Sequence, residues 1–453
     1  MESRNGEGLK MYKIKGKYTT ALVTNDRTES QCVSQITKMT NHPAFVNSIV
    51  IQPDAHAGKG SCIGFTMKLG EEIGPSIVGV DIGCGVTTHY IGKRKVNFKK
   101  LDTQVRNSIP FGFKVRSPDK HHVFRLTSGN SVFTNAIGGA IKLRKSLESA
   151  GWDSLCKVPS YNEGWFLEMC KRVGEDPERV HQSIGTLGGG NHFISIDYST
   201  LDGSSSSNSL YISIHSGSRR LGKSICEYWQ NLARDQWEQG HKDNYRKMME
   251  EATKNTPPAD RERVLKELKG KYKIGIDIKG METLSGDEAV GYLYDMIFAQ
   301  EYASYNRLVM LRDILGILDV PYRPEDTIES VHNYIDMDDL IVRKGAIRSY
   351  EGEKMVIPWN MKDGLVIAEG KSNPEWNFSA PHGAGRKMSR TEAKKRLSKD
   401  EAKKQMSGIY TSVIPLDEAP GAYKDASEVE GLLGPTADVL DRIKPVHNMK
   451  AGK

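Results

Sequence analysis

The chain has 453 residues, of which 38% are hydrophobic and 27% charged, so it is long enough for a large buried core. No apolar run reaches the ~18–20 residues of a membrane span, and the polar N-terminus has no apolar signal segment. The six cysteines form no CxxC pair, which favours a reducing compartment. We therefore expect an intracellular, cytoplasmic protein without membrane contact. The net charge of +7 permits a polyanionic partner but does not demonstrate one.

The first half of the chain is predicted to supply buried strands. Short β-branched runs bounded by Gly or Pro indicate strands at residues 45–51 and 76–82, and again at 192–197 and 210–216. The Ser-rich stretch 202–209 separates the last two and predicts either a hairpin or a loose turn. Adjacent strands would bring the residues at their ends close together.

The second half mixes helices with further strands. A helix is predicted from Lys223 to about Gln239, and periodicity is clearest over residues 287–318. The intervening residues 240–275 are highly charged and predict a helical insertion or arm.

Later strands are predicted at residues 329–336 and 353–359. A capping box formed by Ser389 and Glu392 opens a predicted basic helix. Because no repeat or composition break divides the chain, we predict one compact, enzyme-like α+β domain spanning residues 1–453.

Glycine collects beside His, Asp and Cys in several short clusters. Glycine allows a backbone to approach a ligand closely and to make tight turns, so repeated clusters of this kind indicate a binding site. The clusters are PDAHAGKGSCIG (53–64), VGVDIGCGV (78–86), GTLGGGNHF (185–193), IHSGSRRLG (214–222), VHNYID (331–336) and APHGAGR (380–386).

One set of side chains in these clusters suits a transition metal. Neutral imidazole, thiolate and carboxylate together favour Mn, Fe, Co or Zn over Ca or Mg, and five ligands suggest two ions that share the thiolate. The candidate ligands are Asp81, Cys84, His192, His215 and His332. For Cys84 alone, a buried structural cysteine is an equally good interpretation. Cys62 has no comparable neighbours and is predicted to lie in the core.

His382 belongs to a different kind of cluster. It is flanked by glycines, and Arg386 follows four residues later. Such an imidazole can attack phosphorus while the guanidinium holds the phosphate, although a turn histidine beside a surface arginine is the plainer alternative. Nine Lys and Arg residues between positions 386 and 404 predict a footprint for a nucleic-acid backbone.

Parts of these six clusters, the segment RKGAIRS and a Lys near the C-terminus resemble the RtcB family of RNA ligases over nearly the whole chain. The segments are PDAHAGKG, GVDIGCGV, GTLGGGNHF, HSGSRRLG, HNY, RKGAIRS and PHGAGR. The resemblance implies an RtcB-type fold with central β-sheets sandwiched and surrounded by helices. It also implies a GTP- and Mn-dependent enzyme that joins RNA 3′-phosphate or 2′,3′-cyclic phosphate ends to 5′-hydroxyl ends, in RNA repair or tRNA splicing. An archease-like activator is a further candidate partner.

The resemblance also assigns roles to residues. His382 would carry GMP as a phosphoramidate, and the five candidate ligands would hold two Mn ions, with Cys84 bridging. Asp54 matches a further acidic position near the centre. The implied nucleotide contacts are Asn191, Asn360, His382, Gly383, Gly385 and Lys450.

Two positions depart from the family pattern. The segment GNHF-x-E, whose Glu helps to read guanine, has Ser195 at the Glu position, and the usual IPGSMG segment is replaced by VIPWNMKDG, which contains Asn360. We predict a relaxed nucleotide choice, unless the Asn360 amide supplies an acceptor. The alternatives to a ligase are a metal-dependent phosphatase or nucleotide hydrolase and a non-catalytic protein that binds RNA ends.

Overall fold

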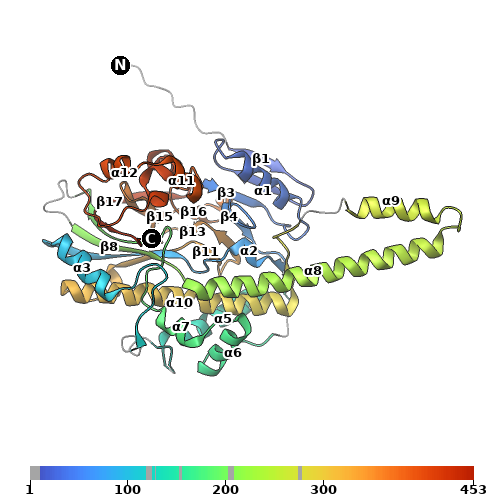
Figure 1. Ribbon diagram of the computed structural model, residues 1–453, viewed down its shortest axis with the longest axis horizontal. Coiled ribbons are helices and arrows are strands. Elements are labelled where there is room, and N and C mark those ends of the chain that lie inside the picture. Colours follow the sequence, from blue (N-terminus) through green and yellow to red (C-terminus); the bar gives the residue numbers. More distant parts are fainter. Residues whose placement is uncertain are drawn as a thin grey trace, which may run out of the picture.

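The computed structural model describes residues 11–118, 125–127, 129–152, 156–201, 209–273 and 278–452. The fold is α+β, as predicted, with two large sheets at the centre and helices around them (Figure 1). In the described part of the chain, no helix combines the length and the apolar composition needed to cross a membrane.

The two large sheets are almost entirely antiparallel; only β2 and β3 pair in parallel. The six-stranded sheet has the order β1 (Tyr12–Lys15), β2 (Thr20–Val23), β3 (Ile49–His56), β4 (Ile63–Lys68), β12 (Ile341–Lys344) and β11 (Asn333–Ile335). The seven-stranded sheet has the order β10 (Thr327–Val331), β6 (Gly85–Lys93), β8 (Ser209–Ser216), β7 (Phe193–Ser199), β17 (Ala437–Met449), β15 (Gly364–Gly370) and β14 (Lys354–Asn360). Two short ladders join β13 (Ala346–Arg348) to β16 (Ser379–Pro381) and β5 (Glu72–Ile73) to β9 (Leu284–Ser285).

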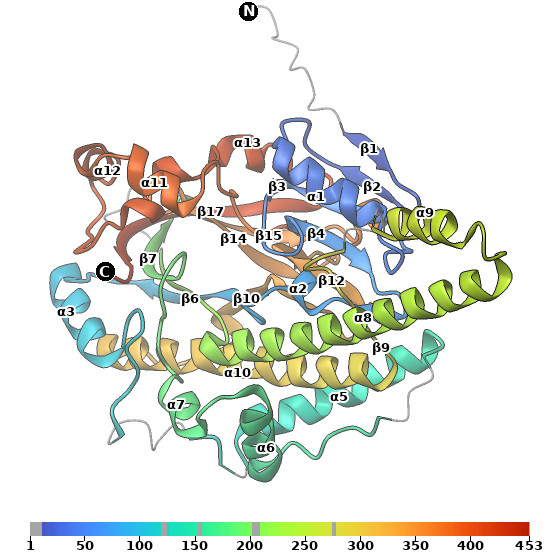
Figure 2. The ribbon, with the colours of Figure 1, turned by 45° about the vertical axis from the view of Figure 1, so that its right-hand side comes forward.

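The helices form layers outside the sheets (Figure 2). They are α1 (Ser30–Thr40), α2 (Pro75–Val78), α3 (Phe98–Ser108), α5 (Ser131–Ser149), α6 (Glu163–Val173), α7 (Pro177–Gln182), α8 (Arg219–Asn255), α9 (Arg261–Lys273), α10 (Gly286–Leu318), α11 (Arg390–Arg396), α12 (Lys399–Gln405) and α13 (Ala426–Glu430). Single 3-10 turns lie at Pro324–Asp326, Pro374–Trp376, Leu416–Glu418 and Pro420–Ala422.

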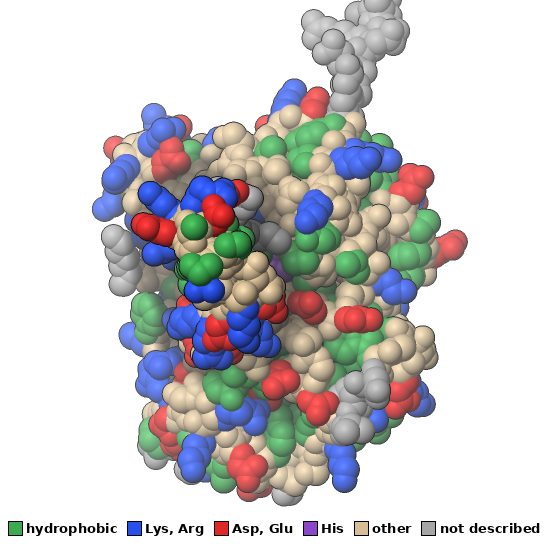
Figure 3. Space-filling view, turned by 90° about the vertical axis from the view of Figure 1, so that its right-hand side faces the viewer, with side chains coloured by type: hydrophobic (Ala, Val, Ile, Leu, Met, Phe, Trp, Pro, Cys, Tyr) green, Lys and Arg blue, Asp and Glu red, His purple; other side chains and the backbone are tan. Residues whose placement is uncertain are grey.

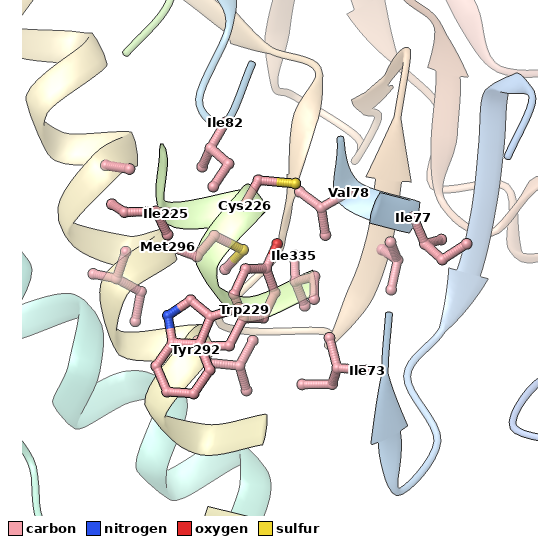
Figure 4. Packing of buried hydrophobic residues seen from close by; sticks show 14 of the residues in the cluster. Ile73, Ile77, Val78, Ile82, Ile225, Cys226, Trp229, Tyr292, Met296 and Ile335 are labelled. Atoms are coloured by element: carbon pink, nitrogen blue, oxygen red, sulfur yellow. The ribbon is translucent and has the colours of Figure 1, made fainter. Parts of the chain in front are cut away.

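Helix α10 is the central helix of the molecule. It packs on β6 and β8 on one side and on α5 and α8 on others, and most of its side chains are buried. A helix that is apolar on all sides is stable only when it is enclosed in this way. Figure 4 shows part of the enclosure, where Tyr292 and Met296 of α10 pack with Trp229 of α8 and Ile335 of β11.

The chain crosses from one sheet to the other at His332. Strand β10 of the seven-stranded sheet ends at Val331, and β11 of the six-stranded sheet begins at Asn333. The His332 amide donates to the Cys84 carbonyl at 2.9 Å, immediately before β6 begins. Two of the candidate metal ligands therefore lie at the junction of the sheets.

Several predicted elements are confirmed, and others are corrected. Strands β7 and β8 pair as predicted, and α10 begins and ends within one residue of its predicted bounds; residues 202–208 of the predicted turn lie outside the described residues. The predicted strand 76–82 is wrong, because Pro75 begins the short helix α2 and Gly79, at φ +99°, ends it. The predicted strand 45–51 starts at Ile49.

Two other predicted elements are divided in the structure. The predicted strand 329–336 breaks at His332, between β10 and β11. The predicted basic helix is two helices, α11 and α12, because Ser398 caps a new helix through the Glu401 amide. The predicted capping box at its start is present, since the Ser389 side chain accepts from the Glu392 amide.

The charged region 240–275 covers the end of α8 and all of α9. These helices pack on each other and project from the body (Figure 1). Acidic and basic side chains both cover this arm where it points toward the viewer in Figure 3. Helix α8 has 37 residues and is therefore ~55 Å long at 1.5 Å per residue.

Candidate active site

A cavity of about 890 Å³ lies where the two sheets meet helix α8 and the segment that leads into α11. All the metal ligands and nucleotide contacts predicted from the sequence line this cavity, and so does His382. The sole predicted site residue that does not line it is Asp54, which is fully buried behind His382. Segments from seven distant parts of the chain thus meet at one place.

The five candidate metal ligands form two groups that share one atom. Cys84, His215 and His332 make one group, and Asp81, Cys84 and His192 make the other. The Cys84 sulfur lies 3.2 Å from His215 Nε2 and 3.6 Å from His192 Nε2. A thiolate in that position can bridge two ions.

Hydrogen bonds and burial favour the neutral imidazoles that a cation requires as ligands. His192 Nδ1 lies 2.9 Å from the Leu187 carbonyl, so a proton there leaves Nε2 free as a ligand atom. Burial, with the charges of neighbouring groups, lowers the pKa of His215 and of His332 and keeps both imidazoles neutral. Burial and the Asp81 charge raise the pKa of Cys84, and a bound cation would reverse this effect.

The glycines around Cys84 are required by close packing. Gly83 has φ +71°, and a Cβ there would lie 2.8 Å from the Gln300 Cα of helix α10. A Cβ at Gly85 would lie 2.5 Å from the Ser330 carbonyl oxygen. The motif D-I-G-C-G therefore makes a tight turn that presses Cys84 between α10 and β10.

His382 follows strand β16 and faces both a carboxylate and the metal groups. Its Nδ1 atom lies 2.6 Å from Asp54 Oδ2, although the two are not aligned as a hydrogen bond. Its ring centroid is 4.9 Å from that of His332. Because Nδ1 faces Asp54, Nε2 is the nitrogen available to a phosphorus atom. Two glycines beside His382 allow this close packing. A Cβ at Gly345 would collide with Ile63, and a Cβ at Gly385 would collide with the Asp54 carbonyl.

A cluster of opposite charges lies on the other side of the cavity. Lys450 Nζ donates to the Asn191 carbonyl at 3.0 Å and lies 3.5 Å from Glu418 Oε2. Glu418 also pairs with Arg386 at 3.1 Å and with Arg390 at 3.4 Å. Burial lowers the pKa of Lys450, while Glu418 opposes that shift.

The structure changes the interpretation of Arg386 and Asn360. Arg386 also donates to the Asp417 carbonyl at 2.6 Å, so its guanidinium is already held by protein groups. The Asn360 amide oxygen accepts from the backbone amides of Lys362 and Asp363 in the β14–β15 turn. Asn360 lines the cavity, but the acceptor expected from it is occupied.

Sequence reasoning missed Glu418 and Asp197, which both line the cavity. Ser195 Oγ donates to Asp197 Oδ2 at 2.7 Å. Burial raises the pKa of Asp197 to about 7, although the hydroxyls of Ser213 and Ser195 lower it. The alternation of strand residues could have located Asp197, because residues two apart share one face of a strand. No local pattern distinguishes Glu418. Cys62 lies in the main core, as predicted.

The comparisons with known proteins agree on one family. The family model described as tRNA-splicing ligase RtcB matches residues 35–451. The RNA-splicing ligase RtcB of Escherichia coli K12 is 27% identical over 439 residues, which cover 92% of this chain and 93% of that protein. The tRNA-splicing ligase RtcB of Aeropyrum pernix is 26% identical over 445 residues, covering 84% and 82%. With the family model matching most of its length, the chain belongs to the RtcB family.

Proposed function

We propose that this protein is an RNA ligase that uses GTP and Mn²⁺. It would join RNA ends that carry a 3′-phosphate or 2′,3′-cyclic phosphate to 5′-hydroxyl ends, with the whole chain as one catalytic domain. The observation that supports this most is the position of His382 beside two ligand groups that share Cys84, in a member of the RtcB family.

The donor set fits transition-metal ions. A thiol, three imidazoles and a carboxylate combine soft, borderline and hard donors. Each of the two groups offers three ligands, with the thiol counted in both, which leaves positions open for substrate oxygens. Bound Mn²⁺ would neutralise charge on the phosphates during transfer. Asp81, Cys84 and His192 would hold one ion, and Cys84, His215 and His332 the other.

The reaction would proceed in three transfers at phosphorus. His382 Nε2 attacks the α-phosphorus of GTP, so that a P–N bond forms and pyrophosphate leaves; Asp54 holds the Nδ1 proton of the resulting imidazolium. An oxygen of the RNA 3′-phosphate then attacks the same phosphorus and releases His382. The 5′-hydroxyl finally attacks the RNA phosphorus and displaces GMP, giving a 3′–5′ phosphodiester. A cyclic phosphate first takes up water to give the 3′-phosphate.

Labelling with α-³²P GTP in Mn²⁺ tests this proposal. We expect a label on the protein that is labile to acid and stable to base, followed by joining of a cyclic-phosphate RNA to a 5′-hydroxyl RNA. A hydrolase would release product without joining ends, and a protein that only binds RNA ends would do neither. His241→Ala, in the projecting part of α8, is the matched control for His382→Ala and should label normally.

A further inference from the structure

Asp197 is a buried carboxylate with an unused acceptor in the wall of the cavity. Its side chain is 0% exposed, and none of the described residues forms a hydrogen bond with its Oδ1 atom. In the described part of the chain, burial and the hydroxyls of Ser213 and Ser195 are the influences on its carboxyl, and no basic side chain is among them. A buried acceptor without a partner carries a large desolvation cost, so its presence in a cavity wall points to a ligand that donates hydrogen bonds there.

The strand geometry directs Asp197 toward the same cavity as His382. Phe193, Ser195 and Asp197 alternate along one face of β7 and line the cavity, whereas Ile194 and Ile196 on the opposite face belong to an apolar cluster. The carboxylate is therefore presented to a ligand in the cavity and not to the apolar core.

The neighbouring strand β17 is irregular opposite Asp197. Pro445 of β17 lies opposite Asp197, and the register of the ladder shifts between Pro445 and His447. Such bulges interrupt pairing and commonly lie near functional sites. Asn448, opposite Ser195, has a second buried acceptor without a partner, its Oδ1 atom, and also lines the cavity. Two unpaired acceptors thus face one space on adjacent strands.

We propose, on the basis of the proposed function, that Asp197 selects guanine and that Ser195 orients it. The Ser195 hydroxyl holds Oδ2 at 2.7 Å and leaves Oδ1 for the base. Guanine presents two adjacent donors, N1–H and N2–H, that a carboxylate can accept together. Adenine presents the lone pair of N1 at the same edge, which the ionised carboxylate repels, so the nucleotides are compared at pH 8, above the Asp197 pKa of about 7. This arrangement reverses the relaxed nucleotide choice expected from Ser195, because the carboxylate has moved two residues along the same strand face.

Discrimination between GTP and ATP should depend on whether the nucleotide base forms hydrogen bonds with the buried polar atoms of the site. A site built to bond a particular group rejects analogues that lack it, because its own polar atoms then stay unpaired. We expect GTP to label the protein at least ~100-fold better than ATP, and ITP, which keeps N1–H and lacks the N2 amino group, to fall between them.

The test compares labelling by α-³²P GTP, ITP and ATP in the wild type and in Asp197→Asn, with Mn²⁺ at matched concentrations. Asp197→Asn should lower the preference for GTP over ATP at least ~10-fold, through KM more than through the maximal labelling rate. Asp441→Asn is the matched control, because Asp441 is also buried with an unpaired Oδ1 but lies outside the cavity. It should leave the preference unchanged.

Further variants distinguish a loss of base selection from a loss of folding in Asp197→Asn. The double variant Ser195→Glu with Asp197→Ser places the carboxylate at position 195 and should restore the preference for GTP over ATP. Ser195→Glu alone places two carboxylates next to each other and should weaken labelling by GTP. Thermal midpoint and metal content report whether each variant is folded.

The outcomes separate this inference from the proposed function. If Asp197→Asn labels and is folded but keeps the wild-type preference, Asp197 does not read the base, and the ligase proposal stands. If no nucleotide labels the wild type, equilibrium binding of GTP and ATP decides. If the wild type binds GTP more tightly than ATP and Asp197→Asn does not, base selection by Asp197 is supported without ligase chemistry. If the wild type binds GTP and ATP equally, both the base-selection inference and the ligase proposal are overturned.

Discussion

Replacing Cys84 should remove more metal than replacing any other single ligand. Its sulfur belongs to both groups, 3.2 Å from His215 Nε2 and 3.6 Å from His192 Nε2, whereas each histidine belongs to one. Cys84→Ala leaves each ion with two ligands of three. His192→Ala and His332→Ala each leave one group of three intact. We therefore expect about two ions per chain in the wild type, about one in either histidine variant and less than one in Cys84→Ala.

The affinity loss should be large enough to measure directly. Even outer-shell partners of a metal ligand are worth ~10–100-fold in affinity, and a bridging thiolate should be worth more at each ion. Each variant is equilibrated with Mn²⁺, passed into metal-free buffer and analysed for metal per chain by mass spectrometry. Cys62→Ala, a cysteine buried in the core, controls for the loss of a thiol. Equal loss in Cys84→Ala and the histidine variants would refute a bridge and indicate a single ion.

Three further predictions address the nucleophile, the RNA surface and the buried carboxylate. His382→Ala should abolish labelling by GTP and keep its metal, since His382 lies outside both ligand groups; metal analysis of that variant checks this. Replacing Lys394, Lys395 and Arg396 of α11 by Gln should reduce the slope of log affinity for RNA against log salt by ~2, at ~0.7–0.9 per contact, and an unchanged slope would make this helix an ordinary solvated surface. Burial raises the pKa of Asp197 from 3.8 to about 7 in the folded protein. The folded protein therefore binds this proton more tightly than the unfolded chain does, and the free energy of unfolding falls as pH rises from 3.8 to about 7. Asp197→Asn should therefore gain up to ~4 kcal/mol in unfolding free energy over the wild type at pH 8 and almost nothing at pH 4, as urea titrations would show.

Motifs of a few residues predicted most of the candidate site residues that meet in the cavity. D-I-G-C-G, G-N-H-F and P-H-G-A-G-R place ligand-type side chains beside glycines, and the packing around Gly83 and Gly345 explains why no larger residue fits there. These segments are informative because each combines a special backbone shape with a reactive side chain. The long helix α10 was equally predictable, because its apolar residues repeat over nine turns.

Other features depended on contacts between distant segments. The β-branched residues 76–82 favour a strand, but Pro75 and Gly79 bound a helical turn that packs on α8 and β12. Arg386 was expected to hold a phosphate, yet Glu418, 32 residues away, already pairs with it. Nothing in the local sequence of either residue indicates that pair.

The sequence by itself determined which residue types meet in the cavity, because thiol, imidazole and carboxylate groups in glycine turns suit few other purposes. Only the tertiary structure decided how those groups are shared. The crossing of the chain at His332 brings the two ligand groups onto one sulfur, and the turn after β14 occupies the Asn360 amide. The Ser195 hydroxyl on β7 donates to one oxygen of the Asp197 carboxylate, and no described residue donates to the other oxygen. Hydrogen-bond partners come from strands far apart in the chain, so local patterns can name the donors and acceptors but cannot pair them.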